Sequence, residues 1–245
     1  MSNYRLVIQY DGGRYRGWQR LGNEENTVQG KLESSLSALA GSSVEVIGCS
    51  RTDAGVHALA QIANFHTEHD LSVPEIRRHL NDHLPRDISV TEVTSVPDNF
   101  HARYQAKSKI YLYRIWNEPY PNPFMRRYSM HVQRRLDLAS MQAAAHHFLG
   151  SHDFTAFSNA KSKKKSMVRE IEAIEITRAE GFVQIRVRGK SFLYNMVRKM
   201  VGALLSVGLG ELPPESIPEL IANRERGHIG SMADACGLYL EEVVF

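Results

Sequence analysis

The first hundred residues alternate between short β-rich runs and helical patterns, and this alternation restricts the chain to a mixed α+β fold. Residues 4–10 (YRLVIQY) alternate in polarity as a half-buried strand does. Thr27 precedes apolar residues at helical spacing, so we expect a helix capped by Thr27 and ended by Gly41. Further strands are expected over 43–49, 61–67 and 88–96, and a short helix over 74–83. The order β-α-β-β-α-β is that of a ferredoxin-like unit, which RNA-recognition modules also use.

A similar order of elements follows in the rest of the chain, with additions. We expect strands over 109–116, 127–133, 169–178, 182–188 and 238–244, and helices over 137–149, 192–207 and 215–223. The pattern predicts two ferredoxin-like, RNA-recognition-module-like halves, 1–105 and 106–245. We expect the halves to join into a mixed or antiparallel sheet with helices on one face, and an active-site cleft between them. The duplication rests on element order alone.

Composition excludes several classes of protein. Hydrophobic residues make up 42% and charged residues 23% of the chain, which argues against a disordered chain, a collagen-like repeat or a coiled coil. Cys49 and Cys236 form no CxxC pair, so a disulfide scaffold and a cysteine-based zinc site are not expected. The apolar runs are too short for a signal peptide or a membrane span. We therefore expect a cytoplasmic protein that does not contact a membrane.

Charge is unevenly distributed along the chain. Residues 1–105 carry 10 Lys and Arg against 13 Asp and Glu, whereas residues 106–245 carry 20 against 14. Within the second part the basic residues cluster at Arg126–Arg127, at Arg134–Arg135 and between Lys161 and Lys165. This asymmetry indicates an anionic partner such as nucleic acid, or else a solvated surface with a basic loop.

Asp53 is the first candidate for chemistry. It lies in the connection SRTDAGVHALA between two expected strands, where a rigid sheet displays reactive side chains. A carboxylate in such a position acts as a nucleophile or as a general acid or base, or else Asp-Ala-Gly only forms a turn. The usual phosphate-binding, dinucleotide-binding and serine-hydrolase motifs are absent, and the eleven histidines are scattered without metal-ligand spacing. No metal site is therefore expected.

Two further candidates lie in the second part of the chain. Arg198 is at the edge of the apolar face of the expected helix over 192–207, so it needs a carboxylate partner such as Asp53 or a route to water. A partner of this kind would favour the ionised carboxylate. Tyr111 and Tyr113 point to the same face of their expected strand, where a tyrosine either stacks on an unpaired base or packs into the core.

The run SRTDAGVHA closely resembles the signature of the tRNA pseudouridine synthase A family. Other segments resemble the same family in the same order along the whole chain. They are YDGGRYRGWQR, TVQGKLE, VPDNFHARYQAKSKIYLYRI, HDFTAFS, VREI, FLYNMVRKMVGALLSVG and GLYLEEV. Two features differ from the family pattern: Ser50 stands where many relatives have glycine, and the segment Lys161–Lys165 is unusually rich in lysine.

This resemblance implies a role for four residues. Asp53 matches the catalytic carboxylate, and Arg198 matches the arginine that pairs with it. Arg51 matches an arginine that takes the place of a flipped-out base. Tyr111 matches an active-site tyrosine that packs against the target uracil. The implied catalytic residues are thus Asp53, Tyr111 and Arg198, and the implied substrate-binding residues are Arg51 and Tyr111.

The resemblance also implies the reaction and the partners. The expected activity is the isomerisation of uridine to pseudouridine at positions 38, 39 and 40 of the tRNA anticodon arm, by base flipping and without a cofactor. The family implies a homodimer that binds tRNA. Two alternatives remain open at this stage: a synthase that acts on another RNA, and an RNA-binding module without catalysis.

Overall fold

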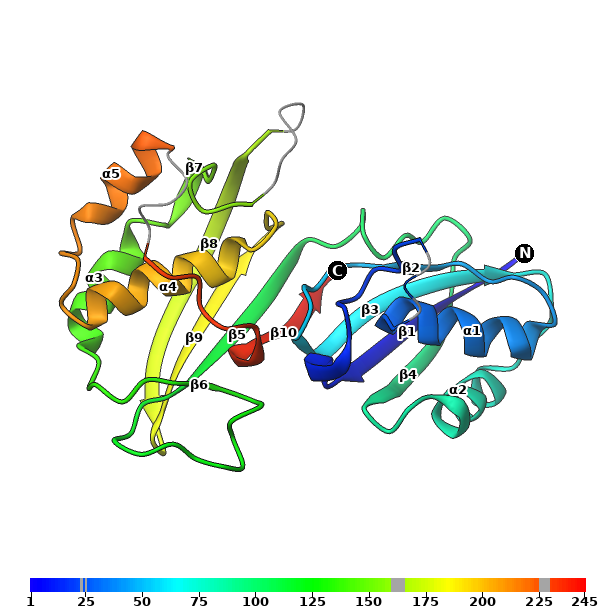
Figure 1. Ribbon diagram of the computed structural model, residues 1–245. Helices are drawn as coiled ribbons and strands as arrows, with labels where there is room; N and C mark the ends of the chain where they lie inside the picture. Colours follow the sequence, from blue (N-terminus) through cyan, green and yellow to red (C-terminus); the bar gives the residue numbers. More distant parts are fainter. Residues whose placement is uncertain (23, 25, 160–165, 225–229) are drawn as a thin grey trace. The chain divides into compact units, whose positions relative to one another are not determined.

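The computed structural model describes residues 1–22, 24, 26–159, 166–224 and 230–245. The chain divides into two compact units (Figure 1). Unit 1 comprises Met1–Lys107 together with Tyr239–Phe245, and unit 2 comprises Ser108–Leu238. The far end of the described chain is therefore part of unit 1. The halves 1–105 and 106–245 stay a prediction about domain organisation.

Unit 1 contains the expected order of strands and helices. Its elements are β1 (Ser2–Tyr10), the 3₁₀ turn η1 (Gly12–Arg14), α1 (Val28–Ala40), β2 (Val46–Gly48), β3 (His57–Thr67), α2 (Val73–His83), β4 (Ile88–Val96) and β10 (Leu238–Val244). Leu238, the first residue of β10, belongs to unit 2, and the rest of the strand belongs to unit 1. The Thr27 hydroxyl accepts a hydrogen bond from Gly30 N, and Gly41 ends α1 in the left-handed conformation, so the predicted cap and stop are both confirmed.

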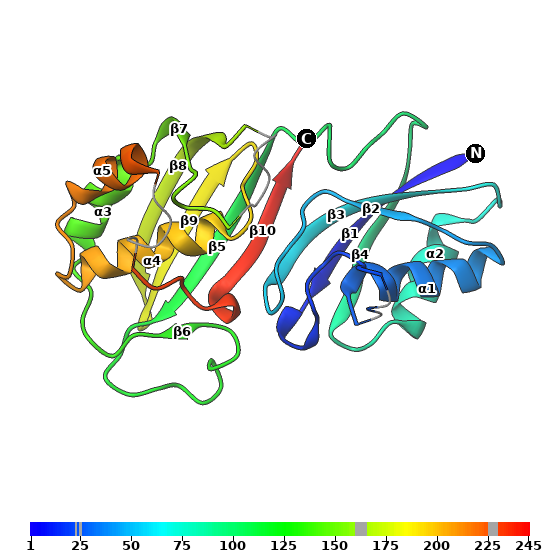
Figure 2. The ribbon, with the colours of Figure 1, turned by 45° about the horizontal axis from the view of Figure 1, so that its top comes forward.

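The sheet of unit 1 is built around β3. Strand β1 pairs antiparallel with both β3 and β4, so the order runs β4-β1-β3. The second edge of β3 is shared by two strands: β2 pairs antiparallel with residues 63–65, and β10 pairs parallel with His57 and Ala58. Helices α1 and α2 lie side by side over one face of this sheet (Figures 1 and 2). Alternate residues of β1 are buried there, as its polarity pattern predicts.

The opposite face of this sheet carries a second, smaller core. Buried Cys49, Ile62, Ala102 and Ala106 pack together there with apolar side chains that include Phe245. A buried amide pair holds the segment 100–106 against the sheet. Asn64 Nδ2 donates to Asn3 Oδ1 at 3.1 Å, and Asn64 Oδ1 accepts from Ala102 N at 2.9 Å. Satisfied polar groups of this kind fix a segment in one place because each lost bond leaves a buried group unpaired.

Unit 2 forms a second α+β sheet. Its elements are β5 (Ser108–Trp116), β6 (Met130–His131), α3 (Leu138–His146), β7 (Gly150–Asp153), β8 (Val168–Ala179), β9 (Phe182–Gly189), α4 (Met196–Gly208), α5 (Ser216–Asn223) and the 3₁₀ turn η2 (Ala235–Gly237). The order β5-β9-β8-β7 is antiparallel, and β6 adds a short parallel pairing to β5. The expected hairpin turns at Glu180 and Gly181, both of which have a positive φ. Helices α3 and α4 pack together.

Several boundaries differ from the prediction for local reasons. Helix α4 begins at Met196 rather than at residue 192, because Asn195 has a φ of 61° and a left-handed residue cannot continue a right-handed helix. Strand β3 begins at His57, four residues earlier than expected, and β2 is reduced to Val46–Gly48. Strand β7 was not expected. Among the helices that the structure describes, none is both long and apolar enough to cross a membrane.

The segment that follows β1 is tied to the start of β4. Asp11 N donates to Asp87 O at 3.0 Å, and the Tyr15 hydroxyl donates to the Asp87 carboxylate at 2.5 Å. The Arg14 guanidinium pairs with the same carboxylate. Burial acts to raise the pKa of Asp87, but the hydrogen bonds from Tyr15 and Arg14 outweigh it and hold the pKa below its ordinary value. Asp87 therefore holds the first part of the segment 11–18 in place next to the start of β4.

We predict that Tyr15→Phe destabilises the protein by about 1 kcal/mol at pH 7 because one hydrogen bond to Asp87 is lost. The pKa of Asp87 is lowered in the folded state, so its stabilisation is complete above the ordinary value near ~3.9 and is lost as the pH falls through the lowered value. The cost of the substitution should therefore shrink between about pH 5 and pH 2. Urea unfolding at a series of pH values measures it.

Tyr4→Phe is the matched control. The Tyr4 hydroxyl donates to the backbone carbonyl of Leu71 at 2.6 Å, which does not titrate. Its cost should stay constant over the same pH range, and a parallel decline in both variants would contradict the role of Asp87.

Candidate active site

Asp53 lies in a turn between β2 and β3. Val56 N donates to Asp53 O at 3.1 Å, and Gly55 occupies the third position of the turn with a φ of 80°. The expected turn chemistry of Asp-Ala-Gly is thus present. The Asp53 side chain is half-buried, two residues after Arg51, which is exposed. The turn and a functional carboxylate are compatible, because the hydrogen bond uses only the Asp53 backbone.

A buried glutamine holds the start of this loop. Gln61 on β3 is fully buried, and its side-chain amide contacts both backbone groups of Ser50. Ser50 N donates to Gln61 Oε1 at 3.2 Å, and Gln61 Nε2 donates to Ser50 O at 2.7 Å. The amide therefore takes the place of a neighbouring strand at the point where the chain leaves β2, and both backbone groups are satisfied in the interior. Sequence reasoning missed this role of Gln61.

The segment 11–18 supports the loop from the other side. Trp18 N donates to Thr52 O at 3.0 Å, and the Tyr10 and Thr52 hydroxyls lie 2.7 Å apart in a hydrogen bond. Gly17 has a φ of 96°, and a Cβ atom on it would lie 2.7 Å from Thr52 O. Gly48 packs directly on the buried Trp18 ring, where a Cβ atom would overlap the ring. The motif YDGGRYRGWQR therefore packs against the loop and fixes the backbone of Thr52, the residue before Asp53.

Unit 2 contains the two tyrosines of the expected strand. Tyr113 on β5 is fully buried, and its hydroxyl donates to Asp234 O at 2.8 Å. Burial raises the pKa of this hydroxyl far above its ordinary value, so it stays protonated as a donor. Tyr113 is thus a core residue and not a base-stacking one. Tyr111, on the same strand, is also buried and packs edge-to-face on Phe192, with ring centroids 5.1 Å apart.

Arg198 lies at the start of α4 in unit 2 and is half-buried. Its Nε donates to the Ala233 carbonyl at 2.8 Å, and Ala233 N in turn donates to the Arg198 carbonyl at 3.2 Å. This two-way contact with the segment before η2 orients the guanidinium group. Pairing of Arg198 with Asp53 stays a prediction. The lysine-rich segment Lys161–Lys165 lies outside the described residues.

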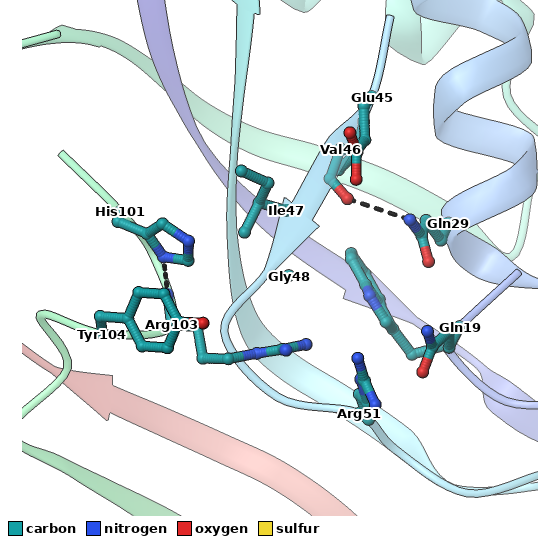
Figure 3. A pocket seen from close by; sticks show the side chains of 11 residues that line it. Gln19, Gln29, Glu45, Val46, Ile47, Gly48, Arg51, His101, Arg103 and Tyr104 are labelled. Atoms are coloured by element: carbon teal, nitrogen blue, oxygen red, sulfur yellow. Dashed lines mark hydrogen bonds between the residues drawn. The ribbon is translucent and has the colours of Figure 1, made fainter. Parts of the chain in front are cut away.

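A polar pocket of about 220 Å³ opens in unit 1 beside Arg51 (Figure 3). Its lining includes Trp18, Gly48 and Arg51 from the braced loop region, and Arg103 and Tyr104 from the segment 100–106. Arg51 is exposed overall, but partial burial of its guanidinium group, and then the positive charge of Arg103, hold its pKa below the ordinary value. Arg103 and Tyr104 belong to the segment VPDNFHARYQAKSKIYLYRI, which resembles the family, but no role was predicted for them because nothing in their spacing marks a pocket.

A family model described as tRNA pseudouridine synthase matches residues 6–105 and 144–245. The chain belongs to this family. The match leaves out residues 106–143, which contain Tyr111. The resemblance stated from the motif SRTDAGVHA is thus confirmed at the level of the family.

Named relatives cover the full length of the chain. It is 60% identical to "tRNA pseudouridine synthase A 2" of Bacillus cereus (strain ZK / E33L), over 100% of both chains. It is 58% identical to "tRNA pseudouridine synthase A" of Bacillus sp. (strain KSM-64), also over 100% of both chains. For the protein of that name from Acetivibrio thermocellus the identity is 44%, again over 100% of both chains.

The contact of Gly17 with the Asp53 loop predicts a large cost for Gly17→Ala. The new Cβ atom would strain a φ of 96° and collide with the Thr52 carbonyl, so we expect a loss of about 3 kcal/mol in the free energy of unfolding. Gly41→Ala is the control: its φ is 66°, and a Cβ atom there has no neighbour within 4 Å. The control should lose only about 1 kcal/mol. Urea unfolding measures both, and equal losses would show that the close approach costs nothing.

Proposed function

We propose that Asp53 is the catalytic carboxylate of this tRNA pseudouridine synthase. One observation carries the proposal: the family signature SRTDAGVHA coincides with the loop that Gln61 and the segment 11–18 hold in place. A reacting group must be kept near its productive geometry by the groups around it. The Gln61 amide holds Ser50, three residues before Asp53, and the segment 11–18 holds Thr52, the residue directly before it.

The reaction is an isomerisation in which no atoms are gained or lost overall. The bond between N1 of uracil and C1′ of the ribose breaks, the ring turns, and C5 bonds to C1′. The hydrogen on C5 is released as a proton, and N1 gains one. Ionised Asp53 attacks C1′ or C6, or assists departure of the ring through a glycal-type route. Each of these routes uses the same carboxylate, and none requires a redox cofactor or a nucleotide.

The other family residues complete the site in this proposal. Arg198 pairs with Asp53 and keeps it ionised and oriented. Tyr111 packs against the target uracil. A base within a stem is out of reach of any carboxylate, so the uridine flips out of the stack at a cost of a few kcal/mol. Arg51 contacts the RNA at the position that the base has left.

The substrate and the setting follow from the same family. The uridines are those at positions 38, 39 and 40 of the tRNA anticodon arm, and the enzyme works as a homodimer in the cytoplasm without a cofactor. The two units are ferredoxin-like in origin. The order β-α-β-β-α-β in unit 1 supports the ferredoxin-like origin, and relatives named tRNA pseudouridine synthase A that match the whole chain support the tRNA substrate.

We predict that Asp53→Asn binds tRNA like the wild type and loses turnover by at least ~10³-fold, because an amide cannot act as a nucleophile or base. The assay is tritium release from a tRNA transcript labelled at C5 of uridine, since that hydrogen leaves only when C5 joins the sugar. Asp82→Asn removes a carboxylate from the exposed side of α2 and is the control, with wild-type turnover expected.

Substantial turnover by Asp53→Asn would refute the catalytic assignment. Binding without turnover by the wild type on both tRNA and total RNA would instead identify an RNA-binding module without catalysis. Turnover on total RNA but not on tRNA would identify a synthase that acts on another RNA.

A further inference from the structure

The pocket beside Arg51 contains two arginine side chains, Arg51 and Arg103, that are not paired with carboxylates in the described part of unit 1. Figure 3 shows the side chains of Arg51 and Arg103 extending into the same space from two different segments. Among the residues that the structure describes, no carboxylate forms an ion pair with either guanidinium group. Arg14, Arg16 and Arg20, on the neighbouring segment, each pair with a carboxylate.

Two facing guanidinium groups repel each other unless an anion lies between them. The lowered pKa of Arg51 reflects its burial and the charge of Arg103. A phosphate group relieves this repulsion best, because the planar guanidinium fork binds phosphate oxygens with two parallel hydrogen bonds. The charged side chains that line the pocket are Arg51, Arg103 and Glu45, so the Glu45 carboxylate offsets one of the two cationic groups. The lining keeps a net positive charge, which suits a phosphate group.

The backbone around Arg103 is fixed before any ligand arrives. Ala102 N donates to the buried Asn64 side chain, and Arg103 N donates to His101 Nδ1 at 3.2 Å. Ala102 itself is fully buried in the small core of unit 1. Because this backbone is already ordered, binding does not carry the additional cost of ordering the segment around Arg103.

An exposed aromatic ring lies at the edge of the same pocket. Tyr104 is 78% exposed, and its ring lies against the His101 ring with centroids 4.1 Å apart. His101 thus supports one side of the ring. A ring held in this way offers its outer face to an unpaired base, and such stacking contributes about 1–3 kcal/mol per base. The amide of Gln19, which also lines the pocket, has no hydrogen-bond partner in the described part of the chain and is free to contact a base edge.

We propose that this pocket binds one unpaired nucleotide of the RNA substrate, next to the uridine that Asp53 acts on. Its phosphate lies between Arg103 and Arg51, and its base stacks on Tyr104. Arg51 keeps its proposed place at the position left by the flipped base, and its guanidinium group contacts the phosphate next to that position. The inference rests on the proposed function, because the ligand is a part of that substrate. Arg51 precedes Asp53 by two residues, which span at most about 7 Å of extended chain. The pocket therefore lies about one nucleotide step from the reacting uridine.

Two substitutions test the phosphate contact and the stacking of the base separately. Arg103→Gln should weaken tRNA binding about 10- to 100-fold and lower the slope of log affinity against log salt by about one, because one phosphate contact is lost. Tyr104→Ala should weaken binding about 5- to 100-fold without a change of slope, since stacking releases no counterions. Tyr104→Phe, which keeps the ring, should restore the affinity.

Arg78→Gln is the matched control. Arg78 is an exposed arginine on α2 of the same unit and does not line the pocket, so its substitution removes the same charge elsewhere. Its affinity and salt slope should stay close to those of the wild type. Filter binding of a tRNA transcript at four potassium chloride concentrations gives both quantities, and thermal unfolding confirms that each variant is folded.

The outcomes distinguish this inference from the proposed function. Wild-type tritium release from tRNA is measured first, and its absence, together with absent tRNA binding, overturns both. With an active wild type, pocket variants that bind like Arg78→Gln overturn the nucleotide pocket alone. An unchanged salt slope in Arg103→Gln refutes the phosphate contact, and failure of Tyr104→Phe to restore affinity refutes the stacked base.

Discussion

The close approach of two backbone segments in unit 1 is the constraint on which the candidate site depends. Gly17 and Trp18 lie so near Thr52 that no side-chain carbon fits between them, and the Trp18 ring fills the space under Gly48. Loops are usually the mobile parts of a fold. This loop is held on one side by that contact and on the other by the Gln61 amide, so Asp53 is displayed on backbone whose position is set by the sheet.

Regular periodicity was enough to predict most of the elements. The strands over 88–96 and 238–244 have the expected bounds, and the Thr27 cap and Gly41 stop are where the sequence patterns place them. The start of α4 was wrong because the left-handed conformation of Asn195 depends on its surroundings and has no periodic signal. The loop position made Asp53 a candidate, but only the family signature decided between a catalytic carboxylate and a simple turn.

The supporting residues of the site were not predictable for a different reason. Gln61 holds a loop eleven residues away, and Gly17 makes room for a carbonyl at Thr52, so both roles exist only after the chain has folded. Arg103 and Tyr104 lie beside Arg51 because the Asn64 amide binds Ala102 N and so fixes the segment 100–106 on the sheet. Net charge gave no signal for the pocket either. Residues 1–105 have more acidic than basic side chains, yet they contain Arg51 and Arg103, which form no ion pair with a carboxylate that the structure describes.

The shared edge of β3 has a consequence for the order in which the protein is made. Strand β10 pairs with His57 and Ala58, directly after the loop that carries Asp53, but its residues follow the whole of unit 2 in the chain. On the ribosome, the earlier strands of unit 1 emerge and pair while this stretch of β3 still lacks its partner. A strand edge left open in this way is a site where other chains can attach. That interval lasts at least until residues 238–244 have been made, so the sheet that carries the Asp53 loop is completed only after unit 2 has been synthesised.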